Sequence, residues 1–164
     1  NMITKEQYLD GLVGEMNIMK HLAEKIKPEQ LTHKPTEPQR TLLELMHYLT
    51  YIFIAGTDGS VNGDGDAWKK YVSAPIPTLE NFSEIMDKQI ADVSSLISGM
   101  TEEGFKEEVN IWGRTQSKAL HLLGLLKMAS AYKMQLFLYM KQSGTANIST
   151  SNLWAGMDQP PKVQ

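Results

Sequence analysis

The sequence predicts an all-α fold: a bundle of four helices with a long loop between the second and the third. Apolar residues recur at helical spacing in four separate segments, and no segment alternates strongly enough to predict a sheet. The chain has 164 residues and 41% hydrophobic content, which is enough for one buried core but not for two typical domains. We therefore expect a bundle domain over residues 2–144 and a C-terminal tail over residues 145–164 that packs on it.

The first two helices are predicted from capping residues and prolines. Thr4 is a suitable N-cap for a helix that extends to Ile26. A proline-rich connector follows, after which Thr41 begins a second helix that we expect to end near Gly56. The stretch GTDGSVNGDGDAWKKYVSAPIPT is rich in Gly, Asp and Pro and shows no period. It is therefore predicted to be a long loop.

The third and fourth helices are also predicted from capping residues and helix-ending residues. Thr78 is a suitable cap for a helix that ends at Gly99. A connector containing EEVNIWGRTQ leads to one long helix over residues 117–144. The remaining tail is polar except at three positions, through which we expect it to fold back on the bundle: Leu153, Trp154 and Met157.

The amino-acid composition and net charge exclude several classes of binding partner. The net charge is -3 and the sequence pI is about 5.8, so there is no basic field for binding nucleic acid. The absence of cysteine excludes disulfides and Cys-ligated zinc. No segment approaches the roughly 20 apolar residues that span a bilayer, and the first residues do not resemble a signal peptide. We expect a cytoplasmic protein that binds neither nucleic acid nor membrane.

The fourth helix carries an unusual mixture of side chains. At about 100° per residue, polar and apolar groups fall on one stripe predicted to face the interior, while Lys133 and Lys141 fall outside it and are predicted to be solvated. Buried polar groups need hydrogen-bond partners. The stripe contains His121, Leu125, Met128, Tyr132, Gln135 and Tyr139.

Segments of two predicted helices, the second and the fourth, resemble motifs of a known family. RTLLELMHYLTYI follows a proline-rich connector and contains His47, while RTQSKAL begins the last helix and MASAYKMQ lies further along it. In order and spacing these segments resemble the DinB-like superfamily, four-helix bundles that include YfiT-type metalloenzymes and thiol-dependent transferases. The resemblance spans nearly the whole domain and implies that His47 stands at the family's first metal-ligand position.

The second motif departs from the family pattern. Where the family has His-x-x-x-His-Arg-Gly-Gln, this chain has Met128 and Tyr132 at the two His positions, with Lys133 and Gln135 following. A thioether and a neutral phenol are poor ligands for zinc or nickel. The resemblance thus implies a fold that has lost its metal site and binds a small molecule or acts as a scaffold, with no cofactor. The expected pocket residues are His47, Met128, Tyr132, Gln135 and His121.

Alternatives remain open at this stage. Enzymatic activity is undecided, although the substitutions argue against it: the alternative is a divalent-metal-dependent thiol transferase or hydrolase with zinc or nickel at His47. An open cavity beside His47 favours ligand binding, whereas a site closed by Met128, Tyr132 and Leu125 favours a structural role. His121 is otherwise a buried group that needs a carbonyl or hydroxyl partner. The resemblance also implies a homodimer.

The run DGSVNGDGD has a second interpretation. Asp58, Ser60 and Asn62 alternate before Gly63, as in the opening of a calcium-binding EF-hand loop. Lys69 stands where that motif requires a bidentate Glu. A turn-rich loop is therefore the preferred interpretation.

Overall fold

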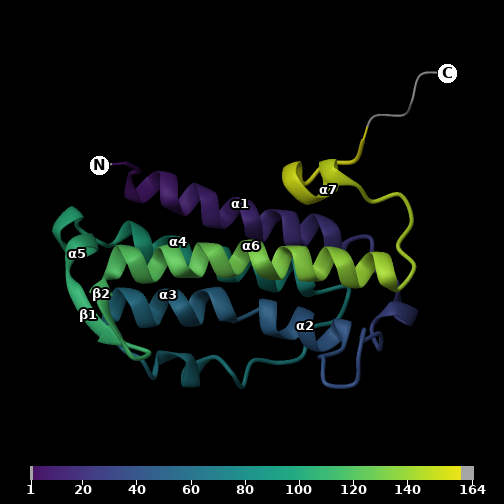
Figure 1. Ribbon diagram of the computed structural model, residues 1–164, viewed down its shortest axis with the longest axis horizontal. Coiled ribbons are helices and arrows are strands. Elements are labelled where there is room, and N and C mark those ends of the chain that lie inside the picture. Colours follow the sequence, from purple (N-terminus) through teal and green to yellow (C-terminus); the bar gives the residue numbers. More distant parts are fainter. Residues whose placement is uncertain (1, 160–164) are drawn as a thin grey trace.

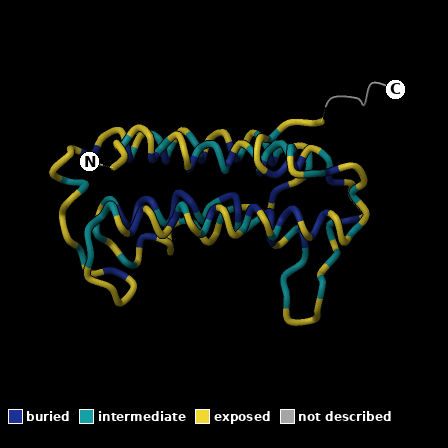
Figure 2. The backbone as a smooth tube through the Cα atoms, turned by 45° about the horizontal axis from the view of Figure 1, so that its top comes forward, coloured by how far each residue is buried: buried dark blue, intermediate teal, exposed yellow. Residues whose placement is uncertain are grey.

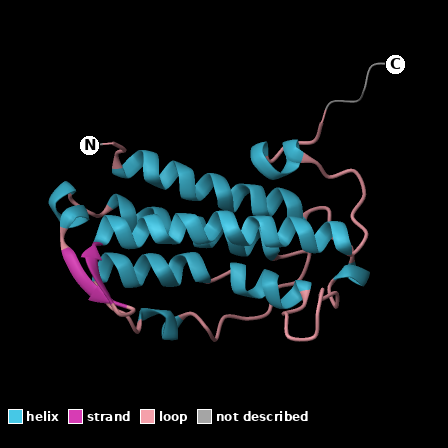
Figure 3. Ribbon diagram, in the orientation of Figure 1, coloured by secondary structure: helices cyan, strands magenta, loops and turns pink. Residues whose placement is uncertain are grey.

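Four helical segments run side by side in the computed structural model, which describes residues 2–159 (Figure 1). They are α1 (Lys5–Ala23), the pair α2 (Leu42–Leu49) and α3 (Ile52–Asn62), α4 (Phe82–Ser98) and α6 (Lys118–Gln142). The predicted all-α four-helix fold is confirmed. Shorter elements complete the fold (Figure 3): η1 (Pro28–Gln30), η2 (Ala67–Lys70), α5 (Glu102–Lys106), β1 (Glu108–Ile111), β2 (Arg114–Ser117) and α7 (Thr150–Ala155).

The helices enclose one hydrophobic core. α1 and α3 lie diagonally opposite each other, and each packs against both α4 and α6. Buried residues follow the inner sides of the helices, while exposed residues follow the outer sides (Figure 2). The capping residues predicted for α1 and α2 are confirmed: Thr4 accepts from the Gln7 N–H, and Thr41 accepts from the Glu44 N–H. The cap predicted at Thr78 is wrong, because α4 begins at Phe82 with Asn81 as its N-cap. No helix in residues 2–159 is long and apolar enough to cross a membrane.

The second predicted helix is divided into α2 and α3. The division falls at Thr50 and Tyr51, and a buried side chain of α4 bridges it. Gln89 donates from Nε2 to the Leu49 carbonyl at 2.9 Å, and its Oε1 accepts from the N–H groups of Phe53 and Ile54 at 3.1 Å. One amide thus partners backbone groups at the end of α2 and the start of α3, which would otherwise lack helical partners.

The predicted end of this helix at Gly56 is wrong. α3 continues to Asn62 and ends at Gly63, which has the left-handed φ of 63° typical of a helix C-terminus. Residues 58–62, the opening of the proposed calcium loop, are therefore helical, so the alternating geometry of an EF-hand does not exist here. The long loop is confirmed over residues 63–81, and it runs along the outside of the bundle (Figure 1).

The connector before α6 is a β-hairpin that the sequence pattern did not reveal. β1 and β2 pair antiparallel, with Ile111 opposite Arg114. The two turn residues are Trp112 with φ of 54° and Gly113 with φ of 76°, as in the tight turns that suit the twist of a hairpin. The hairpin stands at the end of the bundle where α3 ends and α6 begins (Figure 1).

The inward stripe predicted for α6 is correct at His121, Leu125 and Tyr139, which are buried, and wrong at its other three positions. Its predicted members Met128, Tyr132 and Gln135 are only half-buried, whereas Leu122, Ala129, Lys133, Leu136 and Met140 are buried. The prediction that Lys133 is solvated is therefore wrong. Its ammonium lies 2.6 Å from the Glu15 carboxylate of α1, inside the protein.

The C-terminal segment packs on the bundle through α7, which contacts α1. Leu153 and Ile148 are buried there. Trp154 and Met157, which were also predicted to fold inward, are exposed. Trp154 nevertheless lies near the ion pair, with Lys133 Nζ 4.9 Å from its ring centroid.

Candidate ligand-binding cleft

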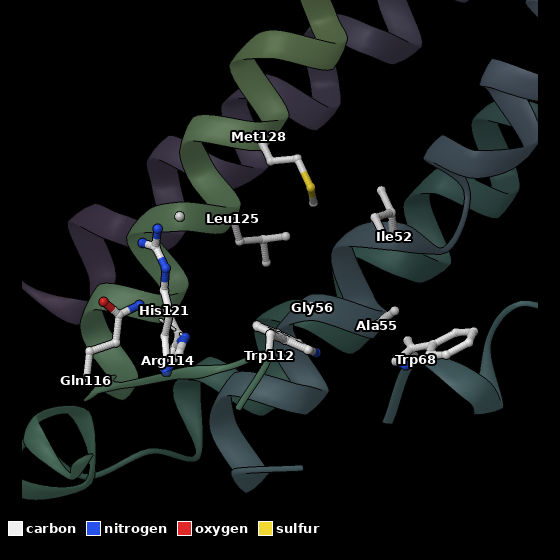
Figure 4. A pocket seen from close by; sticks show the side chains of 11 residues that line it. Ile52, Ala55, Gly56, Trp68, Trp112, Arg114, Gln116, His121, Leu125 and Met128 are labelled. Carbon is white, nitrogen blue, oxygen red and sulfur yellow. Dashed lines mark hydrogen bonds between the residues drawn. The ribbon is translucent and has the colours of Figure 1, made fainter. Parts of the chain in front are cut away.

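A cleft of about 410 Å³ lies at the hairpin end of the bundle (Figure 4). One wall is formed by α3 and the other by α6, while the hairpin and η2 border the opening. The volume falls within the range of small-molecule sites, which are mostly apolar with a few polar groups. The lining residues are Ile52, Ala55, Gly56, Trp68, Trp112, Arg114, Gln116, His121, Gly124, Leu125 and Met128.

The polar groups gather on one side of the cleft. Arg114 and Gln116 come from β2 and His121 from the first turn of α6, and the three side chains lie together in Figure 4. His121 is buried; its Nε2 lies 3.3 Å from the Val109 carbonyl and its Nδ1 3.2 Å from Nε2 of Gln116. A neutral ring with the proton on Nε2 satisfies both contacts. The Val109 carbonyl is thus the partner expected for this buried histidine.

Trp112 stands at the hairpin turn in a conformation that bulky residues rarely adopt. Its indole N–H donates to the Gly65 carbonyl at 3.2 Å, and its ring meets His121 edge-on with centroids 5.7 Å apart. A Cβ atom at Gly59 would lie 2.8 Å from this indole. Close packing against α3 therefore fixes the indole beside the cleft, although the side chain is 51% exposed.

The loop that carries Trp68 is attached to α3 by a buried carboxylate. Asp58 accepts from the Tyr71 hydroxyl at 2.6 Å, from Nζ of Lys70 at 3.0 Å and from the Asn62 amide at 2.7 Å. Burial by itself would raise the pKa of Asp58, but these hydrogen bonds outweigh it and hold the pKa below its ordinary value. The ionised carboxylate thus helps to position η2 and the second tryptophan of the cleft.

The structure separates the five predicted pocket residues. His121 and Met128 line the cleft, while Tyr132 and Gln135 line a different depression between α6 and the segment before α2. His47 lines neither of them. Its Nε2 lies 2.6 Å from the Ala74 carbonyl, so its ring is held by the long loop. The cavity lies beside Met128, not beside His47.

Tyr132 instead joins an aromatic cluster with a cation. Its ring centroid lies 5.1 Å from that of Tyr48, and the Arg40 guanidinium stacks 4.3 Å from the Tyr48 ring centroid. Burial raises the pKa of the Tyr48 hydroxyl well above its usual range, and the hydrogen bond with Tyr132 raises it further. The Tyr48 hydroxyl therefore stays neutral at physiological pH.

The residues at the family's metal-ligand positions do not fit a metal ion. His47 Nε2 is engaged with the Ala74 carbonyl, and the Tyr132 ring packs edge-on against Tyr48. In residues 2–159 there is no group of three His, Cys, Asp or Glu side chains close enough to hold an ion. These side chains therefore give no support for metal-dependent chemistry at these positions.

Together these elements define a helical bundle with a lateral, mostly apolar cleft. The fold is similar to that of a solved structure, the DinB-like protein YjoA of Bacillus subtilis. The superposition has a TM-score of 0.74 at 17% identity and covers 87% of this chain and 96% of that chain. The chain therefore has a DinB-like fold. No protein-family model matches the sequence, and no curated protein is significantly similar to it.

The pocket predicted from the sequence contained only two of the eleven lining residues, and it missed both tryptophans and the polar pair Arg114 and Gln116. The segment NIWGRTQ did contain a hairpin pattern. A residue followed by Gly, here Trp112 and Gly113, between two short runs of alternating polar and apolar residues is typical of a tight hairpin turn. That signal predicts a turn but not the side of the bundle on which it lies.

Proposed function

We propose that this protein is a DinB-like family member that binds a small apolar molecule in the cleft between α3, α6 and the hairpin, without a metal cofactor. The observation that carries the proposal is the cleft itself. It places Trp68 and Trp112 over a floor of aliphatic side chains, and Met128 and His121, two of the residues predicted for the pocket, line it. The DinB-like fold of the neighbouring structure supports the family assignment.

The walls suit an apolar ring system. Aromatic side chains offer large rigid contact areas and favour edge or offset contacts with ligand rings. Met128 is flexible and polarisable, so it adapts to an irregular surface. Trp112 occupies a strained backbone position at the rim, a feature that occurs preferentially at functional sites.

Gly124 leaves open space in the wall of the cleft that α6 forms. A Cβ at Gly124 would meet no other atom within 4 Å, so a larger side chain there can enter the cleft without distorting the helix. Gly14 of α1 gives a matched control, because its Cβ also meets nothing and it does not line the cleft.

The test is a titration with N-phenyl-1-naphthylamine, an uncharged fluorescent probe with an apolar ring body. The proposal predicts saturable binding to the parent protein, at least tenfold weaker binding to Gly124→Leu, and unchanged binding to Gly14→Leu. A probe that does not bind the parent, or that binds all three proteins equally, would contradict it. Circular dichroism of each variant checks that the helices are retained.

A homodimer in the cytoplasm is the second part of the proposal. Four large apolar side chains on the outer side of α6 are 38–51% exposed, which favours an association surface: Leu120, Leu123, Met134 and Leu138. Light scattering coupled to gel filtration should give twice the mass of one 18.4 kDa chain. A monomer at micromolar concentration would refute the dimer without affecting the cleft.

A further inference from the structure

We propose that the ligand of the cleft carries one anionic group, a carboxylate or sulfonate, and that Arg114 binds it. This inference rests on the proposed function and deepens it by naming the chemical class of the ligand. The expected molecule is an amphipathic acid, with a ring body between α3 and α6 and its charge toward β2.

The first argument is the distribution of charge around the cleft. Arg114 is the one side chain with a permanent charge among the eleven described residues that line it. The chain as a whole has a net charge of -3, so this cation is not part of a general basic surface. Arg114 is exposed to solvent and also lines the cleft, so an anionic group on a ligand in the cleft meets this cation and no other permanent charge of the lining.

The second argument is that Arg114 has no internal counter-ion. Among residues 2–159, no carboxylate lies within ion-pair distance of its guanidinium. The other cation at the base of the hairpin, Lys118, is paired with Glu107 at 2.8 Å. The fork of Arg114 is therefore free to donate to a ligand, and its planar geometry matches a carboxylate.

The third argument is the arrangement of the neighbouring polar groups. Gln116 uses one amide N–H for Nδ1 of His121, and His121 uses its own N–H for the Val109 carbonyl. No group in residues 2–159 accepts from the second N–H of the Gln116 amide, and Gln116 and Arg114 both line the cleft. These two residues form a donor-rich edge without an acid, which selects a group that accepts hydrogen bonds and carries negative charge.

The position of this edge sets the orientation of the ligand. In Figure 4 the side chains of Arg114, Gln116 and His121 lie on one side of the cleft. Ile52, Ala55 and Trp68 lie on the opposite side. A ligand that satisfies both sides must therefore be polar at one end only. The limited volume of about 410 Å³ favours a compact ring system over a long acyl chain.

Two matched probes separate this inference from the proposed function. 8-Anilinonaphthalene-1-sulfonate has the same ring body as N-phenyl-1-naphthylamine with one added sulfonate. The inference predicts that the parent binds the sulfonate about tenfold more tightly than the uncharged probe. It also predicts that Arg114→Gln lowers affinity for the sulfonate about tenfold and leaves affinity for the uncharged probe unchanged.

Lys127→Gln is the matched control, because Lys127 is an exposed cation on α6 that does not line the cleft. This variant should leave the affinities of both probes unchanged. Equal affinity of the parent for the two probes, or equal loss of both in Arg114→Gln, would overturn the inference while the proposed function stands. If neither probe binds the parent, the proposed function fails and this inference fails with it.

Discussion

Replacing Lys133 by Met tests the most unusual interaction in the core. The ammonium of Lys133 lies 2.6 Å from the Glu15 carboxylate, and the two side chains are 4% and 16% exposed. Removing one partner of a buried ion pair costs about 3–5 kcal/mol, because the other charge is left without compensation. Here Glu15 keeps a hydrogen bond from the Ser130 hydroxyl at 2.9 Å and some solvent contact. We therefore expect Lys133→Met to lower the free energy of unfolding by about 3 kcal/mol, the lower end of this range.

The assay is urea unfolding followed by far-UV circular dichroism, with thermal unfolding in parallel. For a chain of this size, a loss of about 3 kcal/mol corresponds to a fall in Tm of roughly 6–12 °C. Lys127→Met on the exposed side of α6 is the control and should change stability by less than about 0.5 kcal/mol. The double variant Glu15→Leu/Lys133→Met should regain most of the loss, because no charge then remains uncompensated.

Equal stability of Lys133→Met and Lys127→Met would refute the reasoning. It would mean that Lys133 reaches solvent and that α6 has a different rotation against α1. A double variant less stable than Lys133→Met would instead show that Glu15 stabilises the fold even without the ammonium, which contradicts an uncompensated charge.

Two further outcomes are expected for single substitutions. Gly124→Ala should raise the free energy of unfolding by about 1 kcal/mol in urea, because alanine restricts the unfolded chain and suits the middle of a helix. Gly14→Ala should have the same effect. If both variants were less stable than the parent, these two positions would not be open to a Cβ atom. Asp58→Asn should cost about 1–3 kcal/mol at pH 7. Because the pKa of Asp58 is lowered in the folded protein, its contribution is complete above the unfolded value of about 3.9 and is lost as pH falls through the folded value. The difference from the parent should therefore shrink below about pH 4. A gap that is constant with pH would contradict the ionised tether to Tyr71.

The helix starts were predictable because their signals are local. A hydroxyl side chain followed by helical periodicity identifies the starts of α1 and α2 whatever the rest of the protein does. The break between α2 and α3 has no such signal. It depends on Gln89, whose amide reaches the break from a different helix.

The extension of α3 was missed for a similar reason. Glycines in GTDGSVN indicate a loop by propensity, but here they allow close packing within a helix. A Cβ at Gly56 would lie 2.7 Å from the Leu125 side chain, and one at Gly59 would lie 2.8 Å from Trp112. Tertiary contacts override the local preference.

The inward stripe of α6 was predicted correctly at three of its six positions, but the buried residues beside it were missed. The substituted motif predicted that Met128 and Tyr132 face the interior. The most buried charged residue of this helix is instead Lys133. A lysine is buried only when it has a partner, and that partner, Glu15, lies on α1. Nothing in the sequence of α6 alone reveals the pair.

The most direct test of ligand binding uses the three tryptophans as reporters. Trp68 and Trp112 line the cleft, whereas Trp154 stands on α7 beside Lys133. In a titration of ¹⁵N-labelled protein with N-phenyl-1-naphthylamine, the indole N–H resonances of Trp68 and Trp112 should shift and saturate together while that of Trp154 stays in place. Shifts at Trp154 alone, or no saturable shift at either of the other two, would contradict binding in the cleft.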